Sequence, residues 1–208
     1  MAVDLRALVR MNDVEAVREI LRNDRSMISD FESLLPYAIY TNGSRSKSMV
    51  DTLLLFGADP NSTRTRAYSP LTTAMSIRRD NMIEVIQSLI IAGADVNSIE
   101  KGMSTPLINA ITFITNHTSD VVQALLLAGA DVNVQGKNGD TVMMELLNEY
   151  EVFHTETEQG LRQFLDLFDM LVTAGSDIDT IENDKELNAM DYIQRLPSRL
   201  RRMVLSRL

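Results

Sequence analysis

The sequence contains no cysteine, and this absence excludes several chemistries at once. Without cysteine there is no disulfide framework, no thiolate metal site and no cysteine nucleophile. Long apolar runs are missing too, because the stretch Leu89–Ala94 is far shorter than the roughly 20 residues that a membrane span needs. Asp4 and Arg6 interrupt the N-terminus, where a signal peptide would begin its apolar segment. We therefore expect a cytoplasmic protein with no membrane partner.

Histidine is scarce, and sequence motifs of catalysis are missing. His117 and His154 are the two histidines, and Glu158 follows His154 at the four-residue spacing that places two ligands on one helix face. An isolated pair of this kind is far more often a solvated surface feature than a metal site. No phosphate-binding glycine loop and no nucleophile elbow occurs. We expect a non-enzymatic protein without catalytic residues, cofactor or metal.

The charge of the chain is negative and unevenly distributed. Of 208 residues 45% are hydrophobic, which suffices for a buried core in one or two domains, and the net charge is −9. Residues 140–194 hold 14 acidic residues against Arg162 and Lys185, whereas residues 195–208 hold five arginines and no acidic residue. Most of this surface would repel a phosphate backbone, so we expect no nucleic acid and favour a basic protein as partner. An acidic surface that only maintains solubility is the alternative.

An internal repeat organises most of the chain. An apolar run followed by glycine and aspartate recurs at Leu54–Asn61, Leu89–Asn97, Leu125–Asn133 and, more loosely, Leu171–Asp179. Twelve residues after each of the first three glycines comes a second marker, at Ser69–Leu71, Thr105–Leu107 and Thr141–Met143. Fixed spacing of this kind is typical of proteins built from stacked repeats.

The two markers have a simple physical interpretation. Glycine after an apolar helix end predicts a left-handed C-cap, where a Cβ atom would be strained. Serine or threonine followed by proline predicts a helix start, because the hydroxyl caps the helix and proline loses no needed N–H group. Each unit is then a short helix, a turn, a longer helix and an extended loop. One such pair cannot bury its own apolar face and must stack on its neighbours.

The Thr-Pro-Leu marker and the Leu-Leu-x-x-Gly-Ala-Asp-Val-Asn pattern resemble the ankyrin repeat. The resemblance implies an all-α fold, an ankyrin-repeat solenoid of stacked helix-turn-helix units with hairpin loops, in a single domain over residues 1–208. Units are expected near residues 4–29, 31–66, 67–102, 103–138 and 139–186, with a C-terminal cap at 187–208. The resemblance also implies that a concave face, built from hairpin tips and short inner helices, binds a partner protein.

The fourth full unit is longer than the others. An earlier copy of the second marker is Ser33–Leu35, and the interval from the Ser/Thr to the next glycine is 24 residues in the units that begin with Ser33, Ser69 and Thr105, but 34 from Thr141 to Gly175. We expect the extra residues to lengthen both helices of this unit and to form an acidic ridge. Shortening Glu149–Gln159 is then expected to keep the fold, or even stabilise it, and to abolish binding. Tyr150 and Phe153 are either exposed anchors of an interaction surface or residues that pack between the two helices.

The expected partner-binding residues lie in loops of the units at 31–66, 67–102 and 103–138 and in the long insertion. Met103 belongs to them because it replaces a hairpin glycine, where an apolar side chain would be exposed. The complete set is Arg64, Arg66, Tyr68, Arg78, Arg79, Met103, Glu149, Tyr150, Glu151, Phe153 and His154. We expect a monomer when no partner is bound.

The C-terminal segment Leu196–Leu208 has two interpretations. Its Leu-Pro-x-x-Leu pattern resembles the opening of an F-box, and it also fits a capping helix that docks Leu200, Met203, Val204 and Leu208. Three functional hypotheses follow from the whole sequence. The first is a protein-protein interaction module, the second an acidic immunity or inhibitor protein that neutralises a basic toxin or enzyme. The third is a ubiquitin-ligase adaptor with a truncated F-box-like C-terminal segment.

Overall fold

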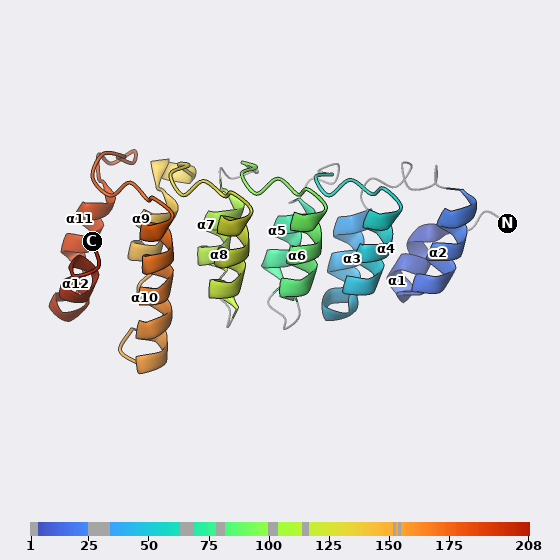
Figure 1. The fold of residues 1–208 in the computed structure, drawn as a ribbon, viewed down its shortest axis with the longest axis horizontal. Coiled ribbons are helices and arrows are strands. Elements are labelled where there is room, and N and C mark those ends of the chain that lie inside the picture. The colour runs from blue at the N-terminus through green and yellow to red at the C-terminus, as the bar shows by residue number, and fades with distance from the viewer. Residues whose placement is uncertain are drawn as a thin grey trace. The chain divides into compact units, whose positions relative to one another are not determined.

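The computed structural model describes residues 4–24, 34–62, 69–77, 82–99, 104–113, 117–151, 153 and 155–208. Within these ranges every regular element is a helix, as predicted (Figure 1). The chain divides into two compact units, Met1–Asp95 and Val96–Leu208, which are described separately. The single domain expected over residues 1–208 stays a prediction.

The first unit contains three consecutive helix pairs. They are α1 (Leu5–Met11) with α2 (Val14–Asn23), α3 (Leu34–Asn42) with α4 (Lys47–Leu55), and α5 (Pro70–Ser76) with α6 (Met82–Ile91). A 3₁₀ turn, η2 (Gly43–Arg45), joins α3 to α4. The first helices contact one another in the order α1, α3, α5, and the second helices in the order α2, α4, α6. The apolar face of each pair is therefore covered by the next pair.

The second unit repeats this arrangement with three further pairs. They are α7 (Pro106–Thr112) with α8 (Thr118–Leu127), α9 (Val142–Asn148) with α10 (Glu158–Thr173), and α11 (Ala189–Arg195) with α12 (Ser198–Leu205). The short 3₁₀ turn η3 (Lys137–Gly139) precedes α9. α9 packs between α7 and α11, while α8 packs against α10. The C-terminal residues, expected to cap the stack, form the last of these pairs.

Helix starts follow the predicted capping chemistry. The Ser69 hydroxyl accepts a hydrogen bond from the backbone N–H of Thr72 at 3.2 Å, and Pro70 occupies the first turn of α5. Thr105 caps α7 in the same way, accepting from the N–H of Ile108 at 3.2 Å. These side chains satisfy N–H groups that have no partner inside the helix. The second marker therefore fixes where α5, α7 and α9 begin.

Helix ends confirm the predicted glycine caps. Gly57, Gly93, Gly129 and Gly175 have φ angles of +99°, +91°, +89° and +89°. A Cβ atom added at any of them would meet nothing within 4 Å, so backbone conformation and not crowding calls for glycine. The alanine or serine N–H that follows each glycine bonds back to the helix, as from Ala130 to Leu125 at 3.0 Å.

The asparagine that ends each copy of the first marker links successive loops. Asn61 donates from its side-chain amide to the carbonyl oxygen of Gly93 at 3.0 Å, and its Oδ1 accepts from the N–H of Asp95 at 2.7 Å. Asn97 and Asn133 make the same two bonds to the glycine and aspartate of the following repeat. The asparagine recurs in the sequence because it forms the same two hydrogen bonds between successive loops within each unit.

A buried polar network joins the loop before α9 to the loop before α11. The Asn183 amide donates to Asp140 Oδ1 at 2.7 Å and to Tyr192 Oη at 3.0 Å, and its Oδ1 accepts from the N–H groups of Lys185 and Leu187. Tyr192 in turn donates to Asp140 at 3.2 Å. Burial raises the pKa of Tyr192, and the neighbouring Asp140 charge raises it further. Asn183 therefore holds both loops in place.

Two glycine substitutions separate strain from crowding. Gly129→Ala is expected to lower the free energy of unfolding by about 1 kcal/mol, because alanine is strained at positive φ. Gly139→Ala is expected to cost at least ~2 kcal/mol, because its Cβ would also stand 2.9 Å from backbone atoms of Asn183 and Asp184. Urea unfolding of both variants measures the difference. Equal losses would show that the contact at Gly139 relaxes without cost.

The insertion in the fourth full unit differs from its predicted form. α9 contains seven residues, the same as α5 and α7, so the expectation that both helices lengthen is wrong for α9. α10 contains 16 residues against ten in α8, and the segment before it spans residues 149–157 instead of 113–117. The start of α10 is fixed by Thr157, whose hydroxyl accepts from the N–H of Gly160 at 3.1 Å. Six of the ten extra residues extend α10, and four extend the loop.

Candidate functional site

Seven of the eleven predicted binding residues lie outside the described residues. They are Arg64, Arg66, Tyr68, Arg78, Arg79, Met103 and His154. Their role in partner binding stays a prediction. The other four belong to the loop between α9 and α10, and they place the candidate site in the second unit.

Phe153 is not an exposed anchor. Only 3% of its surface is accessible, and its ring meets the ring of Phe164 edge-on, with centroids 5.9 Å apart and planes at 69°. This geometry is favourable for a pair of aromatic rings. Of the two interpretations of the insertion, packing between helices is the one that the structure shows for Phe153. The ring is therefore buried in this structure, and a role of Phe153 in partner binding stays a prediction.

Tyr150 and Glu151 remain at the surface beside this buried anchor. Tyr150 is partly exposed and donates from its hydroxyl to Glu151 Oε1 at 3.0 Å. This hydrogen bond to a carboxylate raises the pKa of Tyr150 above its ordinary value. The loop thus presents a partly exposed aromatic ring and an acidic group side by side.

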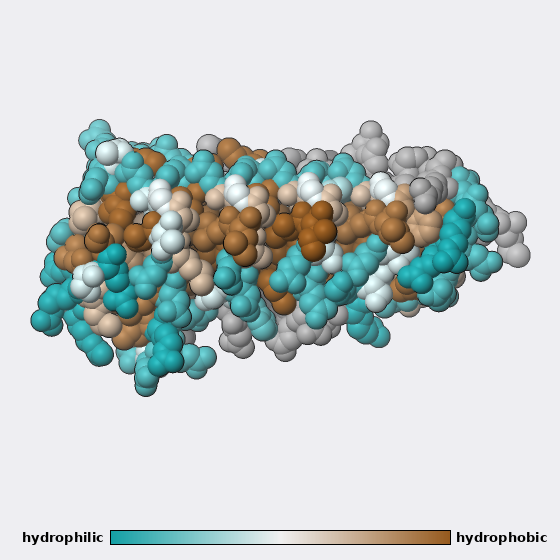
Figure 2. Space-filling view, viewed as in Figure 1, coloured by the Kyte–Doolittle hydropathy of each residue, from teal (hydrophilic) through white to brown (hydrophobic). Residues whose placement is uncertain are grey.

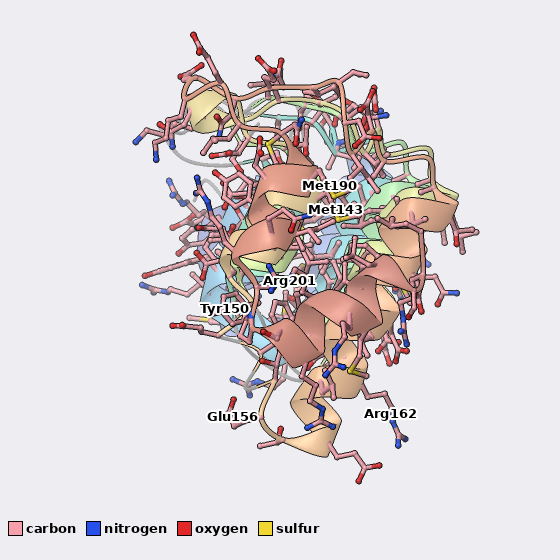
Figure 3. The ribbon with its side chains drawn as sticks, turned by 90° about the vertical axis from the view of Figure 1, so that its left-hand side faces the viewer. Met143, Tyr150, Glu156, Arg162, Met190 and Arg201 are labelled. Atoms are coloured by element: carbon pink, nitrogen blue, oxygen red, sulfur yellow. The ribbon has the colours of Figure 1, made fainter. Side chains whose placement is uncertain are left out.

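The loop and α12 enclose a groove of about 540 Å³. Its lining comes from the loop, from α10 and from the start of α12: Tyr150, Glu151, Thr155, Glu156, Leu161, Pro197, Arg199, Leu200 and Met203. Tyr150 and Glu156 lie to one side of α10, and Arg162 lies to the other (Figure 3). In the sequence, the insertion and the C-terminal segment are separate features, about 40 residues apart. Only the packing of the last two helix pairs brings them together in one groove.

Acidic side chains lie on α9 and on both sides of it: Asp140 precedes the helix, Glu145 lies within it and Glu149 follows it at the start of the loop. Burial raises the pKa of the Glu145 carboxyl, and the negative charges of Asp140 and Glu149 raise it further. The carboxylates of Asp140 and Glu149 add negative charge around Glu145. This surface would therefore attract a cationic group.

The raised pKa of Glu145 has a consequence for stability. Its proton is bound more tightly in the folded than in the unfolded chain, so its contribution is present at low pH and is lost as pH rises through the raised pKa. Glu145→Gln should remove this dependence and stabilise the protein at pH 7 by less than about 1 kcal/mol, because solvent screens the half-buried carboxylate. Urea unfolding between pH 4 and pH 7 tests this, and parallel pH profiles for both proteins would contradict it.

The C-terminal segment packs against the helix that precedes it. Leu196, Leu200 and Val204 are buried, and α12 contacts α11. The Arg207 guanidinium lies 3.1 Å from Asp169 of α10, so one of the five C-terminal arginines pairs with the acidic unit beside it. Leu208 was expected to dock with them, but it is 51% exposed because α12 ends at Leu205.

The remaining chemistry of the described residues is sparse. His117 Nδ1 lies 3.3 Å from Asp120 Oδ2, and this pair with three-residue spacing is at the surface. Within the described ranges, no group of three potential metal-ligating side chains occurs. A search of those same ranges found no helix with the length and apolar character needed to cross a bilayer.

Repeated helix pairs, glycine-closed second helices and a ladder of asparagines define a tandem helical-repeat protein. The sequence profile of ankyrin repeats matches residues 35–136 in three copies. The chain is therefore an ankyrin-repeat protein, which confirms the resemblance drawn from its two markers. Ankyrin repeats are generally protein-protein interaction modules and typically not enzymes.

Solved structures of other ankyrin-repeat proteins share this fold. An ankyrin-repeat domain from Acinetobacter baumannii is 18% identical, with a TM-score of 0.76 over 98% of this chain and 96% of that one. The ankyrin-repeat protein EF0377 is 22% identical, with a TM-score of 0.74 over 97% and 96%. The ankyrin-repeat domain of Bcl-3, a member of the IκB family, is 19% identical, with a TM-score of 0.53 over 98% of both chains. No curated protein matches the sequence.

Proposed function

We propose that this protein is a non-enzymatic interaction module whose partner is a basic protein. The binding surface comprises the face formed by the first helices of the second unit, α7, α9 and α11, which corresponds to the concave face that the family resemblance implies. It also includes the insertion between α9 and α10. The observation that carries the proposal is the placement of acidic side chains at the C-terminal end of α9 and in the loop that follows it, where Glu149 is partly exposed and Glu151 and Glu156 are exposed. A basic partner would relieve the repulsion among these carboxylates and would be attracted to them over a distance.

Two matched variants test the charge argument. Glu149→Gln with Glu151→Gln removes two charges at the proposed surface, and Glu19→Gln with Glu182→Gln removes two exposed charges elsewhere. The immobilised protein is used to capture partners from an extract of its source, and the captured protein is then titrated against each variant. We expect about a tenfold loss of affinity for the first pair and less than about twofold for the second.

Salt dependence gives an independent measurement on the same complex. Raising NaCl from 50 to 300 mM should slow association and weaken binding by about tenfold, because screening shortens the reach of these charges. Capture of neutral or acidic partners only, or an affinity that salt leaves unchanged, would refute a basic partner.

The second candidate function, an acidic inhibitor or immunity protein, rests on the same acidic surface. It differs in its consequence, since the captured partner would be an enzyme or toxin whose activity the complex suppresses. Assaying the partner with and without a stoichiometric amount of this protein decides between them. A gene for the partner beside the gene for this protein would favour neutralisation.

The adaptor hypothesis depends on the segment Leu196–Leu208. The burial of Leu196, Leu200 and Val204 favours a capping role, because a recruitment motif would need these side chains exposed. Deleting the segment should then destabilise the second unit by exposing the apolar residues that it covers. Intact folding with loss of a ligase subunit from the captured complex would favour the adaptor instead.

A further inference from the structure

The groove between the α9–α10 loop and α12 combines apolar side chains with charged side chains of both signs. We propose that it binds a short peptide segment of the partner, in which one large apolar side chain stands beside a lysine or arginine. This inference rests on the proposed function and specifies the chemistry that the surface recognises.

The floor of the groove is apolar. Leu161 contributes from α10, while Leu200 and Met203 contribute from α12, and Pro197 closes the groove at the start of that helix. Its volume of about 540 Å³ lies within the roughly 300–1,000 Å³ typical of ligand pockets. When an apolar group displaces water from leucine and methionine side chains that line such a space, the free energy of the complex is lowered. The floor therefore selects a large apolar side chain.

The rim of the groove is acidic along the loop. Glu151 and Glu156 are exposed there, and the Tyr150 ring stands next to Glu151. Carboxylates attract an ammonium or guanidinium group, and an aromatic face can stabilise the same cation. The loop therefore selects a basic residue close to the apolar one.

The α12 side of the groove carries the opposite charge. Arg199 is exposed on this side and faces the groove across from the acidic loop. It can donate hydrogen bonds to carbonyl oxygens or to a carboxylate of the bound segment. Unlike charges on the two sides give the groove a direction, with the basic end of the peptide towards the loop.

A second apolar surface of this unit serves as a control. Leu126, Leu127 and Met170 line a shallow depression of about 470 Å³ between α8 and α10, and Leu127 is 84% exposed. Figure 2 shows apolar atoms at the surface over the C-terminal end of α8. Asp166 and Asp169 also line this patch, but no lysine or arginine lines it opposite them, so it lacks the unlike charges on two sides that the groove has.

A random library of twelve-residue peptides displayed on phage tests the inference with the full chain as bait. We expect the selected peptides to be enriched in a large apolar residue within three positions of lysine or arginine. Synthetic versions should bind Met203→Ala with Glu151→Gln at least tenfold more weakly than the unmodified protein. They should bind Leu127→Ala with Glu182→Gln within twofold, because that pair removes one apolar group and one charge outside the groove.

Unfolding curves for both double variants show whether either has a folding defect. We expect none, because Met203 is partly exposed and Leu127 is exposed. The inference is overturned if no peptide is selected, if selected peptides are neutral or acidic, or if they bind both double variants equally. The captured partner distinguishes this failure from failure of the proposed function. If the partner depends on Glu149 and Glu151 but not on Met203, the groove assignment fails while the proposed function stands.

Discussion

Replacing Phe153 by alanine should lower the free energy of unfolding by about 3–4 kcal/mol, the range for large-to-small changes in a packed core. Phe153 is nearly inaccessible, and its ring packs edge-on against Phe164 of α10, which is itself fully buried. Truncation leaves a cavity beside Phe164 and loosens the loop that Phe153 fastens to the helix. Chemical unfolding followed by circular dichroism measures the loss.

Tyr150→Ala is the matched control within the same loop. Its side chain is partly exposed and makes its hydrogen bond to Glu151 at the surface, so its loss should cost less than about 1 kcal/mol. Equal effects of the two substitutions would contradict the distinction between a buried and an exposed aromatic residue.

The packing of Phe153 also changes what loop shortening should do. The sequence alone predicts that shortening Glu149–Gln159 leaves the fold intact or makes it more stable. Removing Phe153 with the loop would uncover Phe164, so the shortened chain is now expected to lose stability along with binding. A variant that keeps Phe153 while changing Glu149 and Glu151 separates the two effects.

Asn183→Asp should destabilise the protein at neutral pH by about 2–3 kcal/mol, although the side chain keeps its size. The Asn183 amide nitrogen lies 2.7 Å from Asp140 Oδ1 and is buried, so the new carboxylate would face an existing one where a donor stood before. Two carboxyl groups this close raise the pKa of the pair, because both cannot ionise without strong repulsion.

The pH dependence of this variant has a definite sign. The raised pKa in the folded state means that stability is regained at low pH and lost as pH rises through it. Unfolding at pH 4 and pH 7 should therefore differ more for Asn183→Asp than for the unmodified protein. Asn183→Ala, which removes the hydrogen bonds without adding charge, should be destabilised to a similar extent at both values. A pH-independent loss for Asn183→Asp would show that Asp140 moves away.

The helix pairs and their limits could be predicted from the sequence because local chemistry determines them. Gly57, Gly93 and Gly129 end second helices through positive φ, and Ser69 and Thr105 begin first helices through capping hydroxyls. Each of these effects acts within about five residues along the chain. A spacing repeated in the sequence is then sufficient to predict repeated helix pairs and the family to which they belong.

The form of the insertion and the groove beside it could not be predicted in this way. Whether Phe153 points to solvent or to Phe164, and whether residues 149–157 become helix or loop, depends on contacts with α10. Leu161, Leu200 and Met203 share a groove with Tyr150 only because α12 folds back beside the loop. Local propensity determined the repeat, whereas burial of side chains distant in sequence decided which residues reach the surface, since burial depends on what packs against them in three dimensions.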